Sequence, residues 1–178
     1  MMVTKVKMDW FLFAIVAGLA LFGAAMVYSA SAMIALRESQ SQFTYFYKQF
    51  AFTLAGLAGM FAVSKIDYRR YQTQWVVYAF VAVTVIFLVA VFAFPAINGA
   101  RRWIRFAGLS FQPSEMAKLA LPLFLAYFLT KNEKTVGDLK ATVIPCVAVM
   151  CLLAGLVFLE PDLGTVIVLC AIFSAVYF

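Results

Sequence analysis

Long apolar stretches alternate with short polar ones along the chain. The length of each apolar stretch is close to the roughly 17–25 residues that a helix needs to cross the hydrocarbon core of a bilayer. A transmembrane β-barrel would instead show short segments of alternating polarity. The pattern therefore predicts an all-α polytopic membrane protein with one transmembrane domain over residues 1–178 and six transmembrane helices, near residues 10–36, 47–63, 75–94, 113–130, 141–159 and 164–178.

The composition agrees with this class and narrows the chemistry. Hydrophobic residues make up 66% of the chain and charged residues 12%, whereas soluble domains carry about 25% charged residues. The net charge of +6 comes from basic residues in short loops, which is typical of membrane topology signals. No nucleic-acid-binding module is visible, so we expect no nucleic-acid partner. Because the chain has no histidine, His-based zinc sites and Ser-His triads are excluded.

The distribution of Lys and Arg predicts an N-terminus in the cytoplasm. With that orientation, the inner side holds eight basic residues, namely Lys5, Lys7, Lys65, Arg69, Arg70, Lys131, Lys134 and Lys140. The outer side holds five, namely Arg37, Lys48, Arg101, Arg102 and Arg105. The excess on the inner side follows the positive-inside rule.

Three of the five outer charges lie in one short stretch, NGARRWIRFAGLSFQPSEMAK, residues 98–118. Arginine presents a planar and permanently charged fork that matches phosphate and carboxylate groups. Arg101, Arg102 and Arg105 could therefore form an anion site at the outer membrane surface. They could equally extend toward lipid headgroups beside Trp103. The charge pattern alone leaves both interpretations open.

The same stretch ends in an ionisable pair within an apolar helix. Pro113 suits the first turn of a helix, and Glu115 in that turn suits the helix dipole. Lys118 follows at i+3 and can pair with Glu115. A helix start that neutralises its own charges would explain the pair. Ionisable groups within a span usually face a cavity or the bundle interior, however, which favours a site.

A second acidic motif, LEPDLGT at residues 159–165, lies in a short outer turn. Glu160 and Asp162 could pair with the arginines across the outer face, bind a cation or handle protons. The motif could also be an ordinary turn between two helices. The arginines, the Glu115–Lys118 pair and these two carboxylates are all expected on the outer side. We therefore predict a polar cavity that opens outward. Its oxygen-rich chemistry would suit phosphate with Mg²⁺ or Mn²⁺ better than a redox metal.

Three motifs in this order, NGARRWI, FQPSEMAK and EPDLGT, resemble those of the SEDS family (shape, elongation, division and sporulation) of bacterial membrane proteins. The segments MVYSASAMIAL and YFYKQ are more similar to the cell-division branch, FtsW, than to the elongation branch, RodA. The resemblance covers essentially the whole chain. It implies that the chain is the N-terminal part of a bundle of about ten transmembrane helices in the bacterial cytoplasmic (inner) membrane.

The resemblance also implies an activity. Members of the family are peptidoglycan glycosyltransferases that polymerise lipid II at the outer face of the membrane and work with a class B penicillin-binding protein and other division proteins. By this resemblance Arg102, Glu115, Lys118 and Asp162 line the outward cavity. We expect Arg101, Arg102 and Lys118 to contact pyrophosphate, and Glu115 and Asp162 to hold these cations in place or to help retain the metal.

The catalytic base that the resemblance implies is an aspartate in a later outer loop, downstream of Phe178. We therefore assign no catalytic base within residues 1–178 and expect this portion to be inactive alone. Three alternatives remain open from the sequence: a lipid II flippase, a RodA-type elongation polymerase, and a docking platform for division proteins. The flippase would also use an arginine-lined cavity, but it would move lipid II without joining its sugars.

Overall fold

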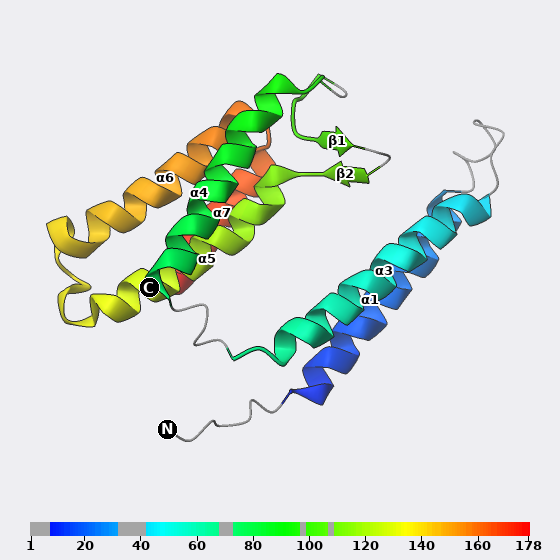
Figure 1. Ribbon diagram of the computed structural model, residues 1–178, viewed down its shortest axis with the longest axis horizontal. Coiled ribbons are helices and arrows are strands. Elements are labelled where there is room, and N and C mark those ends of the chain that lie inside the picture. The colour runs from blue at the N-terminus through cyan, green and yellow to red at the C-terminus, as the bar shows by residue number, and fades with distance from the viewer. Residues whose placement is uncertain (1–7, 32–41, 68–72, 97–98, 107–108) are drawn as a thin grey trace. The chain divides into compact units, whose positions relative to one another are not determined.

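The computed structural model describes residues 8–31, 42–67, 73–96, 99–106 and 109–178. Its elements fall into two compact units, residues 1–68 and 69–178, and Figure 1 gives their labels. The N-terminal unit contains α1 (Trp10–Ala30) and α3 (Gln42–Ser64), and the C-terminal unit contains the remaining elements. Five basic residues used to predict orientation lie outside the described residues, namely Lys5, Lys7, Arg37, Arg69 and Arg70.

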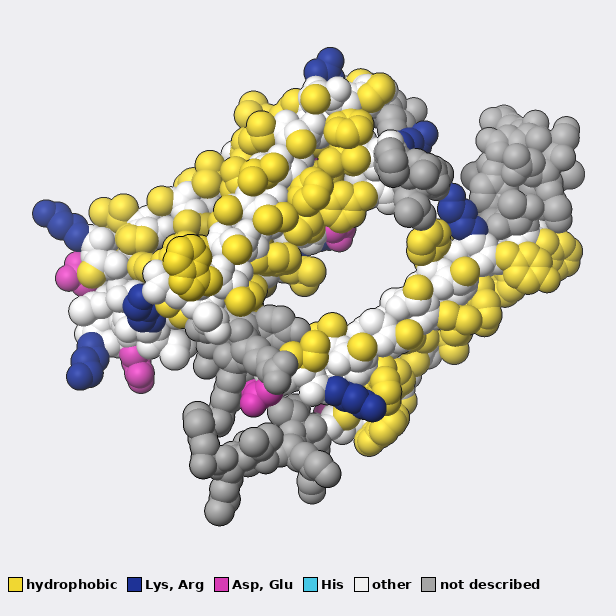
Figure 2. All heavy atoms as spheres, viewed as in Figure 1, with side chains coloured by type: hydrophobic (Ala, Val, Ile, Leu, Met, Phe, Trp, Pro, Cys, Tyr) yellow, Lys and Arg dark blue, Asp and Glu magenta, His cyan; other side chains and the backbone are white. Residues whose placement is uncertain are grey.

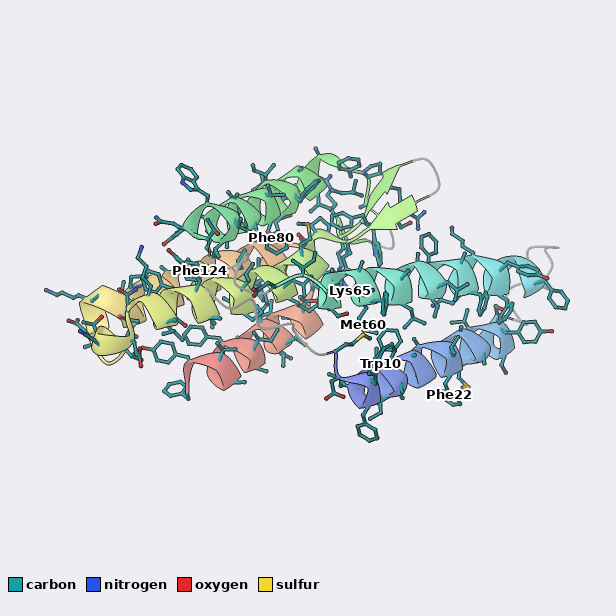
Figure 3. The ribbon with its side chains drawn as sticks, turned by 60° about the horizontal axis from the view of Figure 1, so that its bottom comes forward. Trp10, Phe22, Met60, Lys65, Phe80 and Phe124 are labelled. Carbon is teal, nitrogen blue, oxygen red and sulfur yellow. The ribbon has the colours of Figure 1, made fainter. Side chains whose placement is uncertain are left out.

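In the N-terminal unit α1 and α3 pack against each other as a helical hairpin. Asp9 caps α1 by accepting hydrogen bonds of 3.0 Å from the backbone N–H groups of Phe11 and Leu12. Trp10 lies where α1 begins and Lys65 follows the end of α3 (Figure 3). Both side chains lie against the ring of Phe61. Aromatic and basic side chains at helix ends are typical of the membrane–water interface.

The C-terminal unit is a bundle of four longer helices, α4 (Gln74–Ala90), α5 (Pro113–Lys131), α6 (Ile144–Leu159) and α7 (Leu163–Tyr177). Helix α5 packs against α4, α6 and α7. The buried alanines Ala117 and Ala120 of α5 allow neighbouring helices to approach closely, as small residues do in membranes. Larger side chains with no exposed surface complete the core, namely Val77, Leu88, Leu121, Leu125, Leu153, Val157 and Leu169.

Shorter elements connect these helices. The 3₁₀ turn η2 (Val91–Ala93) follows α4, the 3₁₀ turn η3 (Glu133–Thr135) follows α5, and the π-helical turn η4 (Leu139–Val143) leads into α6. Strands β1 (Ile104–Phe106) and β2 (Leu109–Phe111) form an antiparallel hairpin between α4 and α5. The ring of Phe111 contacts that of Phe87 on α4, with centroids 5.6 Å apart. The sequence pattern did not predict this hairpin.

The all-α polytopic class is confirmed, and each of the six predicted stretches contains a helix. Residues 32–36 of the first predicted span lie outside the described residues. Among the described residues, four helical segments are long and apolar enough to cross a membrane, namely Trp10–Ala30, Phe46–Ser64, Gln74–Ala93 and Leu139–Leu159. Helix α5, which contains Glu115, Lys118 and Lys131, is not among them, and α7 is shorter, with 15 residues.

The surface agrees with a membrane environment. Large hydrophobic side chains are exposed along the helices, among them Leu19, Ile86, Leu119, Leu152 and Ile167. Figure 2 shows hydrophobic side chains covering the helices, with most Lys and Arg side chains near helix ends. Such a surface would be costly in water but matches the hydrocarbon of a bilayer. A single domain over residues 1–178 stays a prediction.

Candidate functional site

One end of the C-terminal unit gathers the predicted site residues. The β1–β2 hairpin, the start of α5 and the turn between α6 and α7 all lie at this end (Figure 1). Arg101 and Arg102 precede β1, Glu115 and Lys118 lie in the first turns of α5, and Asp162 directly precedes α7. Alternating helix directions thus bring together residues that are about 60 positions apart in sequence.

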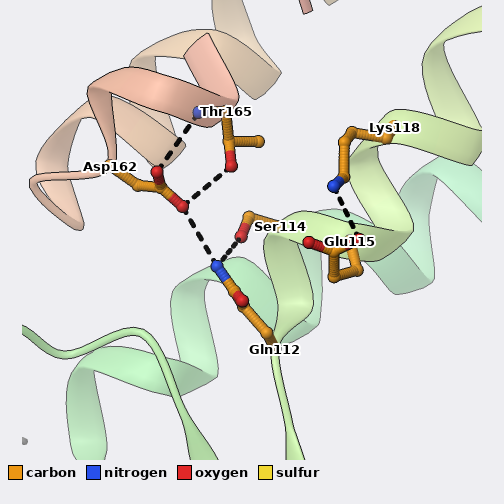
Figure 4. A network of polar contacts seen from close by, with 6 residues as sticks. All are labelled: Gln112, Ser114, Glu115, Lys118, Asp162 and Thr165. Carbon is orange, nitrogen blue, oxygen red and sulfur yellow. Dashed lines mark hydrogen bonds and ion pairs between the residues drawn. The ribbon is translucent and has the colours of Figure 1, made fainter. Parts of the chain in front are cut away.

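Asp162 is the centre of a hydrogen-bond network at this end (Figure 4). As the N-cap of α7 it accepts hydrogen bonds from the backbone N–H of Thr165 at 3.2 Å and from the Thr165 hydroxyl at 2.8 Å. The side-chain amide of Gln112, the N-cap residue of α5, donates to its Oδ2 at 3.0 Å and also contacts Ser114 Oγ at 2.8 Å. The network therefore joins the beginnings of α5 and α7.

Arg102 contacts the turn between α6 and α7 that also contains Asp162. Its Nε donates to the main-chain carbonyl of Glu160 at 3.0 Å, and its Nη2 donates to that of Pro161. The guanidinium is thus held by main-chain carbonyls rather than by the carboxylate of Asp162. Carbonyl oxygens fix its position without cancelling its positive charge, so the guanidinium remains a net cation at this turn.

The neighbouring arginines have different surroundings. Gly99 has a φ of +80°, which glycine adopts without a Cβ clash, and the chain then enters the segment with the arginines. Arg101 Nη1 donates to the carbonyl of Phe92 in η2 at 2.8 Å. Arg105 lies in β1 opposite Ser110 and is exposed. Arg101 is exposed as well, and Arg102 is half-buried.

Glu115 and Lys118 form the predicted ion pair on α5. Lys118 Nζ lies 2.6 Å from Glu115 Oε2, and the exposed fractions of the two side chains are 29% for Lys118 and 57% for Glu115. Both groups therefore remain reachable from outside the bundle. Figure 4 shows this pair on the turns of α5 that follow Gln112 and Ser114.

Glu160 has an unusual environment. It lies in the turn after α6 with no exposed surface, and neither of its carboxyl oxygens has a hydrogen-bond partner among the described residues. Burial, the larger cause, and repulsion by Asp162 raise the pKa of Glu160 to about 7, and the positive charge of Arg102 acts in the opposite direction. A buried carboxyl without partners favours its neutral form, because desolvation penalises the charged one.

The structure thus brings Arg102 and Asp162 to one turn, with Glu115 and Lys118 paired at the adjoining start of α5. The expectation that carboxylates hold the cations fits Glu115, whereas Arg102 is held by main-chain oxygens. The sequence pattern did not predict a role in the site for Gln112, Ser114 and Thr165, although all three lie within the motifs FQPSEMAK and EPDLGT. Their position at helix starts was the available signal, because such residues cap helices.

Two further expectations concern the surroundings of these residues. An apolar groove of about 580 Å³ lies along α4 and α5, lined by Val76, Ala79, Phe80, Val83, Met116 and Leu123. It contains none of the predicted site residues, so the outward polar cavity stays a prediction. Among the described residues no group of three acidic or cysteine side chains could hold a metal ion. Both oxygens of Asp162 already accept hydrogen bonds, so these residues do not fit a complete Mg²⁺ or Mn²⁺ site.

Comparison with known proteins adds the family. The model of the cell cycle protein family that comprises FtsW, RodA and SpoVE matches residues 9–178. A probable peptidoglycan glycosyltransferase FtsW from Trichlorobacter lovleyi is 33% identical over 165 residues, which cover 92% of this chain and 43% of that protein. Stage V sporulation protein E from Bacillus subtilis is 32% identical over 165 residues, which cover 90% of this chain and 44% of that protein.

A solved structure agrees with these relatives. The structure is that of a peptidoglycan synthase complex and concerns the coordination of polymerization and crosslinking. It matches 95% of this chain with a TM-score of 0.71 and 27% sequence identity. The match covers 47% of that structure's chain, so the present chain spans less than half the length of these relatives. With a family model that matches nearly all of its residues, the chain belongs to the FtsW, RodA and SpoVE family of cell cycle proteins.

Proposed function

We propose that the protein serves bacterial cell division as a peptidoglycan glycosyltransferase that polymerises lipid II. It would work at the outer face of the bacterial cytoplasmic (inner) membrane, as a multi-pass protein with its N-terminus in the cytoplasm. The observation that carries the proposal is the guanidinium of Arg102, which is fixed by the carbonyls of Glu160 and Pro161 while it keeps its positive charge.

The reaction needs such a group. The 4-hydroxyl oxygen of one saccharide forms a bond to C1 of another, the bond from C1 to the lipid pyrophosphate breaks, and negative charge develops on the leaving pyrophosphate. Fixed cations at that position lower the barrier, because they stabilise charge that develops in the transition state. We assign this role to Arg102 first, with Arg101 and Lys118 as further contacts to the pyrophosphate.

The proton of the acceptor hydroxyl must go to a base, and Asp162 is poorly suited to that role. Its two carboxylate oxygens accept hydrogen bonds from Thr165 and Gln112. Both oxygens are therefore engaged in holding the beginnings of α5 and α7 together. We therefore give Asp162 a positioning role. The base is expected in the part of the protein that follows Phe178.

The expected partners follow from the same proposal. The similar peptidoglycan synthase complex coordinates polymerization with crosslinking. This supports a class B penicillin-binding protein as the partner that crosslinks the strands, together with other division proteins. Any use of Mg²⁺ or Mn²⁺ would need donors beyond the residues described here, so no step of the reaction is assigned to a metal.

The proposal is tested with the purified full-length protein and lipid II. Replacement Arg102→Ala should abolish the synthesis of glycan strands, and Arg102→Lys should restore it only in part, because lysine cannot form two hydrogen bonds at fixed angles. Lys134→Ala is a matched control, since Lys134 is an exposed cation of η3. Equal polymerisation by wild type and Arg102→Ala would contradict the assignment.

The same preparation separates the enzyme from the flippase. In vesicles, a polymerase produces glycan strands, whereas a flippase moves lipid II across the bilayer without joining the sugars. Transbilayer movement without strands, lost in Arg102→Ala, would establish the transporter instead. A docking platform would keep its partner binding after Arg102→Ala and Glu115→Ala.

A further inference from the structure

The turn between α6 and α7 contains an acidic side chain that the proposed reaction does not use. Glu160 has no exposed surface, and both of its carboxyl oxygens lack hydrogen-bond partners among the described residues. A buried and unpaired polar group is costly, so a fold retains it only where something compensates for the cost.

Glu160 is also directly connected to the proposed anion site. Its main-chain carbonyl accepts a hydrogen bond of 3.0 Å from Arg102 Nε. The donors of Arg102 that contact this turn bind carbonyl oxygens, so its charge is not neutralised by the Glu160 side chain. Glu160 thus positions the guanidinium of Arg102 through its main-chain carbonyl. Its carboxyl group, once charged, could neutralise that guanidinium.

We propose that Glu160 is a positioning residue that is uncharged when the anion site is open, and that loss of its proton closes the site by giving Arg102 an internal counter-ion. The proton leaves to water, and the carboxylate that remains attracts the guanidinium. A phosphate anion then meets a site of lower positive potential and is repelled by a second negative charge. The proposal rests on the proposed function, because it assumes that Arg102 binds the phosphate groups of the substrate.

The charged groups around Glu160 are consistent with this switch. Arg102 and Asp162 act on its titration with opposite signs. Arg101 donates to Phe92, and Glu115 and Lys118 pair with each other. The spans of α4, α6 and α7 contain no Asp, Glu, Lys or Arg. Because repulsion by Asp162 opposes ionisation of Glu160, a charged Glu160 is unfavourable unless Arg102 moves to compensate it.

Glu160 should lose its proton near neutral pH, since its pKa is raised to about 7 by desolvation and by Asp162. By linkage, an anion that prefers the neutral acid must also promote its protonation. Pyrophosphate binding near pH 7 should therefore take up a proton. Affinity should fall about tenfold between about pH 6 and about pH 8, the effect expected of one added charge close to the ligand.

The experiment uses the full-length protein in nanodiscs and inorganic pyrophosphate as the probe, measured by calorimetry in two buffers of different ionisation enthalpy. Wild type should show proton uptake and the tenfold loss of affinity. Glu160→Gln imitates the neutral acid, so it should bind as wild type does at about pH 6 and show neither effect beyond what the ionisation of pyrophosphate itself produces. Glu133→Gln, at an exposed acid of η3, is the matched control and should keep them.

A second measurement does not depend on anion binding. Infrared difference spectra should show the C=O band of a protonated carboxylic acid that disappears as the pH rises through about 7, and Glu160→Gln should lack this band. A band already lost near the ordinary carboxyl pKa of about 4 would overturn the switch even if pyrophosphate binds. The same pH dependence of pyrophosphate affinity in wild type and Glu160→Gln would overturn it too. Failure of pyrophosphate to bind at any pH would refute the proposed function as well, and the infrared band distinguishes the two failures.

Discussion

The side-chain amide of Gln112 donates a hydrogen bond of 3.0 Å to the carboxylate of Asp162, 50 residues further along the chain. Gln112 directly precedes α5 and Asp162 directly precedes α7, so this contact fixes the beginnings of two helices against each other. The same two segments contain the Glu115–Lys118 pair and the carbonyls that hold Arg102. The geometry of the candidate site therefore depends on a contact that binds no ligand itself.

Replacement Gln112→Glu should destabilise this junction. It removes the amide donor and places a second carboxylate beside Asp162, and leaving a partly buried acceptor without its donor costs about 1–3 kcal/mol. We expect a lower melting temperature of the detergent-solubilised protein. Gln74→Glu is the control, since the side chain of Gln74 makes an exposed contact of 3.4 Å with Lys131, and this variant should melt as wild type does. Equal melting of the two variants would show that the Gln112 contact contributes no stability.

Replacement Thr165→Val should weaken the same network from the side of α7. Valine has nearly the shape of threonine but removes the hydroxyl that donates to Asp162 at 2.8 Å in a buried position. The expected loss is about 1–3 kcal/mol of unfolding free energy. Thr130→Val provides the comparison, because the Thr130 hydroxyl contacts Ala126 at an exposed position. A loss of stability in Thr130→Val as large as that in Thr165→Val would refute the role of the buried network.

Much of the fold could be predicted from the sequence because hydrophobic stretches of this length have few alternatives in a bilayer. Each predicted stretch contains a helix, and the pairing of Glu115 with Lys118 followed from their i, i+3 spacing on α5. These are local relationships, which depend on helix periodicity and not on tertiary packing.

The remaining features depend on contacts between distant segments. The hairpin of β1 and β2 has three residues in each strand, too few for a clear alternation of polarity. The attachment of Arg102 to Glu160 and Pro161 spans 58 and 59 residues. Because main-chain carbonyls are present at every position, no residue pattern could indicate that Arg102 would bind these two rather than an acidic side chain.

The stability of the protein should depend on pH through Glu160. Its pKa is raised from 4.5 to about 7 in the folded state, so between these values the folded chain binds more protons than the unfolded one. Stability therefore falls as the pH rises through this window and then levels off. Glu160→Gln removes the titration and should stabilise the protein above pH 7 by on the order of 3 kcal/mol, with little effect below pH 4.5.

This prediction is checked by melting temperatures of wild type and Glu160→Gln across that pH range. The difference between them should grow from about pH 4.5 to about pH 7 and then remain constant. Glu133→Gln, at an exposed position in η3, should give a curve parallel to that of wild type. A constant difference between wild type and Glu160→Gln at every pH would show that Glu160 is charged in the folded protein throughout.

Exchanging the two charges of the α5 ion pair should separate stability from function. The double variant Glu115→Lys/Lys118→Glu keeps a pair at i, i+3 spacing, and exposed pairs contribute only about 0–1 kcal/mol. Its melting temperature should therefore fall only slightly, because Lys in the first turn of α5 opposes the helix dipole. Lipid II polymerisation should be lost, because Lys118, whose side chain is 29% exposed, would no longer present a cation to the pyrophosphate. Glu115→Gln keeps this cation and should retain more activity than the double variant. A folded double variant that polymerises as wild type does would remove Lys118 from the site and leave Arg102 as the principal cation.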